Sequence, residues 1–203
     1  MGSALHVAGD IAGAERAFDQ AFAVLDDSDD GFQRAQLLIA RGLMRIDAGE
    51  LARGLQDTRD ARAVELGRAH ADAQSVMYTY GNEARALVLM GDRAGAMAVL
   101  EDGIAAFSRE PGARGKHFAG ALQAELAVHA LEVGDRARAI ALCTEAARRV
   151  EPDSPQAGHL ALTHALALGD DNPADRAVLI DRARAIATRL HDSGLAQRLA
   201  AVP

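Results

Sequence analysis

The chain has 203 residues, a formal net charge of −7 and an isoelectric point of about 5.5. Its 22 basic residues are scattered among 29 acidic ones, whereas phosphate backbones are bound by clustered Lys and Arg, so we expect no nucleic-acid binding. The longest apolar stretch is too short to cross a bilayer, which excludes a membrane span. The single cysteine, Cys143, cannot form an internal disulfide, and this suits the cytoplasm, where we expect the protein to reside.

Alanine dominates the composition, aromatic residues make up only 3%, and there is no Trp. Alanine is the strongest helix former, and no sustained alternation of β-branched residues predicts a strand. We therefore predict an all-α chain, in which small side chains set the distances between packed helices.

A short phrase, two residues followed by Gly and then Asp or Glu, recurs at intervals of 35 to 43 residues. Its glycines are Gly9, Gly49, Gly91, Gly134 and Gly169. A glycine after an apolar helical run supplies the left-handed residue that ends a helix, and the acidic residue behind it starts the next helix. The phrase therefore predicts the turn of a helical hairpin, and its recurrence predicts a stack of such hairpins.

We expect five hairpins, over residues 1–30, 31–67, 68–110, 111–152 and 153–192, in a single domain with a capping helix in 193–203. The predicted helices are Ile11–Leu25, Phe32–Ala48, Leu51–Leu66, Arg68–Met90, Arg93–Phe107, His117–Val133, Arg136–Val150, Gln156–Leu168, Ala174–His191 and Leu195–Ala201. Gly81 is expected to weaken its helix, and Ser108–Lys116 is expected to be a loop. Because Gly9 leaves little room for a first helix and Met1-Gly2-Ser3 is typical of a cloning scar, we expect a piece of a longer protein; a natural start with a short cap is the alternative.

The sequence offers little catalytic or metal-binding chemistry. His159 and His164 are five residues apart and so lie on different helix faces, whereas zinc-binding pairs prefer a spacing of three or four. Glu125 and His129 share one face but form only a single pair. Cys143 falls at an inward position, which predicts a buried thiol. We expect no metal or cofactor and no enzyme; if there is one, Tyr78, Arg85, Glu125 and His129 are its candidate residues.

Aligned on the turn glycine, these hairpins resemble the tetratricopeptide repeat. That motif has a small residue seven positions before the glycine, as at Gly42, Ala84 and Ala127. It has Ala five positions after it, as at Ala14, Ala96 and Ala139, with Gly54 as a substitute. The match departs from the family in its longer period and at Leu162, where the small residue is missing. The resemblance implies a right-handed superhelix whose first helices line a concave groove.

The resemblance also implies which residues line that groove. In the second and third hairpins they are Gln36, Ile39, Leu43, Ile46, Asp47, Tyr78, Gly81, Arg85, Val88 and Leu89. In the fourth and fifth they are Ala121, Ala124, Val128, Leu131, Glu132, Gln156, His159, Thr163 and Leu166. The set is largely apolar and lacks the Lys and Asn with which family members grip a terminal carboxylate.

An amphipathic helix or an apolar extended segment of a partner protein therefore fits this groove best. Packing of the stripe within the superhelix or against a second copy in a homodimer, and a small-molecule pocket, remain alternatives. Long, Ala- and Arg-rich units of this kind also look like the repeat arrays of large LuxR-type transcription regulators. That likeness implies the alternative function of ligand sensing or oligomerisation within a larger bacterial regulator.

Overall fold

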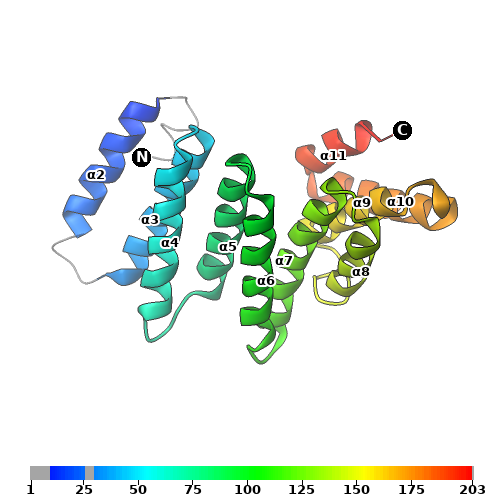
Figure 1. Cartoon of the computed structure of the whole chain (residues 1–203), viewed down its shortest axis with the longest axis horizontal. Coiled ribbons are helices and arrows are strands. Elements are labelled where there is room, and N and C mark those ends of the chain that lie inside the picture. The colour runs from blue at the N-terminus through cyan, green and yellow to red at the C-terminus, as the bar shows by residue number, and fades with distance from the viewer. Residues whose placement is uncertain (1–9, 26–29, 203) are drawn as a thin grey trace. The chain divides into compact units, whose positions relative to one another are not determined.

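The computed structural model describes residues 10–25 and 30–202, and every long regular element in these ranges is an α-helix, as predicted. The chain divides into two compact units, Met1–Val99 and Leu100–Pro203. The first contains α2 (Ile11–Leu25), α3 (Gly31–Asp47), α4 (Leu51–Gly67), α5 (Ala73–Leu89) and the start of α6 (Arg93–Ser108). The second contains the rest of α6, α7 (Ala113–Glu132), α8 (Arg136–Ala146), α9 (Pro155–Leu168), the 3-10 turn η1 (Gly169–Asp171), α10 (Pro173–Leu190) and α11 (Ser193–Ala200). Figure 1 shows the helices of each unit as consecutive pairs joined by short turns.

The turn glycines do what the repeated phrase predicts. Gly49, Gly91, Gly134 and Gly169 all have positive φ angles, between 57° and 86°. Such backbone is strained for residues with a side chain, so glycine is required there. The first of the five, Gly9, lies outside the described residues.

The acidic residues after the turns act as helix caps in three of the hairpins. Before α2, Asp10 Oδ1 accepts a hydrogen bond of 2.8 Å from the Gly13 amide. Asp92 Oδ1 accepts a hydrogen bond of 2.8 Å from the Gly95 amide, and Asp135 Oδ1 accepts one of 3.0 Å from the Arg138 amide. Each bond satisfies an amide of the first helical turn that has no partner within the helix. Glu50 stands at the same position before α4 but forms no capping bond with its side chain.

The helices of the α3–α4 pair approach each other at two glycines. A Cβ atom added to Gly54 would lie 2.8 Å from the carbonyl oxygen of Gly42 and 2.7 Å from Ile46 Cγ1. The equivalent small residues of the next two hairpins are fully buried: Ala84, Ala96, Ala127 and Ala139. The small-residue positions predicted from the repeat therefore lie in the interior of these hairpins, and at Gly42 and Gly54 the two helices are in close contact.

A buried ionic cluster joins the first three helices of the first unit. Asp57 on α4 accepts hydrogen bonds from both Arg41 (2.8 and 3.0 Å) and Arg45 (2.7 Å) on α3. Arg45, only 6% exposed, also donates to both carboxylate oxygens of Glu15 on α2, at 2.7 and 2.8 Å. Arg45 therefore holds the Glu15 carboxylate in its charged form and lowers the pKa of Glu15.

Several helix ends differ from the sequence prediction. Helix α5 begins at Ala73 instead of Arg68, because Asp72 caps it by accepting a hydrogen bond from the Ser75 amide. Helix α7 begins at Ala113 instead of His117, because Gly112 takes the position before the helix with a φ of 100°. Helix α8 ends at Ala146 instead of Val150, where the chain continues in turns.

Gly81 lies inside α5, which continues through it without a break. The predicted capping helix is present as α11. Its Leu195 and Leu199 are buried in one cluster with Leu162 of α9 and Ile180 of α10. Helix α11 therefore covers apolar surface of the last hairpin, as expected of a cap.

We predict that Gly54→Ala destabilises the protein by about 1–3 kcal/mol, the usual cost of forcing an extra carbon into close packing. The new Cβ would collide with backbone of α3, which cannot move aside without opening the hairpin. A lower thermal unfolding midpoint would show this. Gly67→Ala, in the same helix with nothing within 4 Å of its Cβ, is the control and should leave the midpoint unchanged or raise it. Equal midpoints for both variants would contradict the close approach.

Candidate functional site

In each unit the first helices of successive hairpins pack against each other: α3 against α5 in the first, and α7 against α9 in the second. These four helices carry all the residues that the sequence predicts for the groove. The two surfaces can therefore be compared as candidate sites.

On the first unit the predicted residues form a surface held by polar links. Gln36 on α3 donates a hydrogen bond of 2.5 Å to Ser75 Oγ on α5, and Arg85 forms an ion pair of 2.5 Å with Asp47. Tyr78 and Leu89 are about half exposed. Their neighbours Ile39, Leu43 and Val88 are half-buried.

Ile46 was predicted to line the groove, and the structure places it elsewhere. It is only 2% exposed and packs against Gly54 of α4, so it belongs to the interior of the α3–α4 hairpin. Only the exposed or half-buried residues among those predicted on this unit are accessible to a partner.

On the second unit α7 and α9 enclose a hollow of about 240 Å³, which we call the α7–α9 pocket. Its lining consists of Ala121, Ala124, Glu125, Val128, Pro155, Gln156, His159, Leu160, Thr163 and Arg198. Six of these ten were predicted from the repeat register: Ala121, Ala124, Val128, Gln156, His159 and Thr163. Leu131, also predicted, lies outside the lining and packs against buried Ala130 and Ala139.

A chain of polar contacts fixes α11 at the edge of this pocket. Arg198 donates from Nη1 to His159 Nδ1 at 3.0 Å, and His159 Nε2 lies 3.2 Å from Asp192 Oδ2. Because a guanidinium can only donate, this arrangement requires a neutral His159 with its proton on Nε2, donated to Asp192. Asp192 also accepts from the Leu195 amide at 2.9 Å, and this bond, with His159, lowers the pKa of the Asp192 carboxyl.

Glu125 is the charged residue of the pocket that lacks such a partner. Among the described residues no hydrogen bond or ion pair reaches its carboxylate, although the side chain is partly buried in the wall of the pocket. Burial raises the pKa of the Glu125 carboxyl, and His129, one turn along α7, offsets part of the rise. His129 itself lies 3.4 Å from Glu132, on the exposed side.

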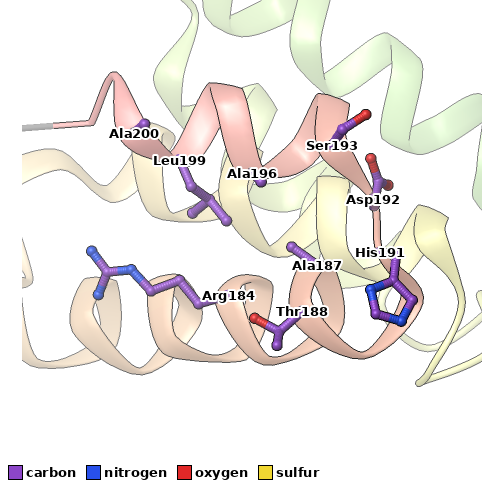
Figure 2. A pocket seen from close by; sticks show the side chains of 9 residues that line it. All are labelled: Arg184, Ala187, Thr188, His191, Asp192, Ser193, Ala196, Leu199 and Ala200. Atoms are coloured by element: carbon purple, nitrogen blue, oxygen red, sulfur yellow. The ribbon is translucent and has the colours of Figure 1, made fainter.

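A larger hollow of about 720 Å³ lies between α10 and α11 and is open to solvent (Figure 2). Figure 2 shows Arg184 and Thr188 on one side of it and Ser193 and Leu199 on the other. Its charged groups are engaged, since Arg184 pairs with Asp181, and Asp192 with His159. We therefore place the candidate site at the smaller pocket, where a carboxylate remains unpaired.

The histidines and the candidate catalytic residues can be placed in the structure. No group of three or more His, Cys, Asp or Glu side chains in the part of the chain that the structure describes could hold a metal ion. His159 faces the α7–α9 pocket, whereas His164 lies with Leu179 and Arg182 on the side of α10, so the two point to different places as predicted. Arg85, a candidate catalytic residue, is occupied by Asp47.

Comparison with known proteins adds no identification: no protein-family model, curated protein or solved structure matches the chain. None of the helices in the described part is both long and apolar enough to cross a membrane.

We predict that Glu125→Gln makes the protein more stable at neutral and alkaline pH. The raised pKa means that the folded state binds the Glu125 proton more tightly than the unfolded chain does, whose carboxyl titrates near its ordinary value of about 4.5. The stability that the protonated Glu125 contributes is therefore fully present below that value. It is lost as the pH rises through the folded pKa, where the partly buried carboxylate becomes charged. Among the groups facing it, His129, His159 and Arg198 remain unchanged in the variant.

The measurement is the unfolding midpoint in urea at pH 4 and pH 8. The gain of Glu125→Gln over wild type should be larger at pH 8. Glu151→Gln, at an exposed position, is the matched control and should show no such gain. A loss of stability at pH 8 in the Glu125 variant would contradict an unpaired, partly buried carboxylate.

We predict that the Cys143 thiol does not react in the native protein. It is fully buried, as the sequence indicates, and burial raises its pKa to about 12. Because the thiolate is the reactive form, almost none is present at pH 8. Ellman's reagent should therefore label Cys143 at pH 8 only when urea unfolds the protein, and rapid labelling without urea would show the thiol to be accessible.

Proposed function

We propose that this chain is a non-catalytic binding module that holds a segment of a partner protein against the α7–α9 face. The observation that carries the proposal is the convergence of positions from two successive hairpins. Residues that lie more than thirty positions apart in sequence, such as Ala121 and His159, line one pocket. Their selection by the repeat register, together with the resemblance to tetratricopeptide repeats, supports a recognition surface of that kind.

The size of the pocket favours a peptide over a metabolite. Clefts for drug-sized molecules are usually about 300–1,000 Å³ and enclose most of the ligand. At about 240 Å³ the α7–α9 pocket is smaller, and it is open on one side. It therefore suits one or two side chains of a longer segment whose remaining residues lie outside.

Apolar residues and polar residues of the pocket would contact different parts of a bound segment. Ala121, Ala124, Val128 and Leu160 offer apolar surface to a partner side chain. Polar groups stand among them on α9, where the Gln156 amide is exposed. An exposed amide can both donate to and accept from the backbone of a bound segment.

We predict that Val128→Arg weakens the binding of 12-residue peptides selected on the wild-type protein from a random display library. The longer side chain would fill the hollow and add a charge to its apolar wall. Fluorescence anisotropy with the labelled peptides measures the loss, expected to be about tenfold or more in Kd.

Val178→Arg provides the matched control. Val178 lies on α10, is 68% exposed and is not part of the pocket lining, so the same substitution adds the same charge elsewhere. Peptides that bind wild type and both variants equally would show that binding occurs at another surface. Failure to select any peptide would argue against the module itself.

A further inference from the structure

We propose that the segment held in the α7–α9 pocket inserts a lysine or arginine, flanked by apolar residues, and that its cation pairs with Glu125. This inference rests on the function proposed above and adds the chemistry of the occupant. It follows from which charged groups of the pocket already have partners and which one does not.

Arg198, the other charged side chain that lines this pocket, already has a partner within the chain. The Arg198 guanidinium donates to His159, and His159 contacts Asp192. Asp192 in turn caps α11. Glu125 takes no part in these contacts and has no hydrogen-bond or ion-pair partner of its own among the described residues. The negative charge of Glu125 is therefore available to pair with a positive charge of the bound segment.

An occupant without a positive charge would raise the free-energy cost of keeping the Glu125 carboxylate charged. Covering the pocket with an apolar side chain would remove the remaining water from the carboxylate and leave it unpaired, which is strongly unfavourable. An acidic side chain would add repulsion. A lysine or arginine instead supplies the missing charge, and the hydrogen bonds between the two charged groups are among the stronger ones in proteins.

The walls of the pocket also fit such a side chain. Lysine and arginine carry long apolar stems, which pack along apolar surface while the charged head reaches a polar group. Ala121 and Ala124 precede Glu125 on α7, and Val128 follows it, so α7 presents apolar surface around the carboxylate. The net charge of −7 adds a general attraction for basic partners.

A metal ion does not meet these requirements. No group of three or more potential ligands exists among the described residues, so Glu125 would be nearly alone in holding one. The unpaired carboxylate is therefore better explained by an organic cation that brings its own apolar stem.

The test is a parallel selection from the random 12-residue peptide library on immobilised full chain, with wild type and Glu125→Gln as targets. The glutamine keeps the shape of the side chain and removes its charge. Peptides selected on wild type should be enriched in Lys or Arg next to apolar residues, and those selected on the variant should lose the enrichment. Individual basic peptides should bind the variant about tenfold more weakly in anisotropy, and Glu151→Gln should bind them like wild type.

A second measurement locates the contact. Replacing the basic residue of a selected peptide by norleucine should weaken its binding to wild type but not to Glu125→Gln, because the two changes remove the same ion pair. Equal losses on both proteins would place the cation elsewhere and overturn the inference.

The remaining outcomes separate this inference from the proposed function. Apolar peptides that depend on Val128 but show no basic enrichment would overturn the pairing with Glu125 and leave the binding module standing. Enrichment of acidic peptides would overturn the pairing in the same way. If no peptide is selected on either protein, both proposals fail.

Discussion

The structure depends on how closely two helices can approach when neither has a side chain between them. At Gly42 and Gly54 the backbones of α3 and α4 come so near that a single added carbon would overlap a carbonyl oxygen. In the following hairpins buried alanines, such as Ala127 and Ala139, take these positions. Close approach lets a hairpin bury its interior with small residues, which explains how a chain with 3% aromatic residues forms cores at all.

Small residues set distances, but in the first unit charged residues hold neighbouring helices together. Arg45 bridges Glu15 of α2 and Asp57 of α4, and buried Glu83 of α5 accepts hydrogen bonds from Arg59 and Arg62 of α4. Removing one member of such a cluster leaves its partner charged and enclosed, so the contacts favour one arrangement of these helices over others. The sequence could not single them out, because Asp57 and Glu83 look the same as the many acidic residues on exposed helix faces.

The parts of the fold that could be predicted from sequence are those for which the backbone allows few residue types. Positive φ angles require glycine, so Gly49 and Gly134 marked the turns correctly. The same reasoning failed at the start of α7, where Gly112 and Gly115 were read as a loop. Gly112 does precede the helix, but Gly115 lies within it, because its missing side chain admits the carbonyl oxygen of Phe107. A glycine needed for contact and one needed for a turn look identical in sequence.

In the candidate site, too, the sequence could predict the positions that follow from the repeat but not the contacts that depend on residues distant in sequence. Register placed Val128 and His159 on facing helices, and both line the pocket. It did not assign Arg198 to the groove, because its helix was expected only as a cap, and it named Glu125 only as a partner of His129 and a candidate catalytic residue. Their environment depends on which other helices pack nearby: Arg198 reaches His159 of α9, whereas no hydrogen bond or ion pair reaches the Glu125 carboxylate within the described part of the chain. If α7 were needed only for packing, a leucine in place of Glu125 would fill the hollow and avoid an unpaired charge. The proposed binding role would account for an unpaired carboxylate at this position, set among the small residues Ala121 and Ala124 of the pocket wall.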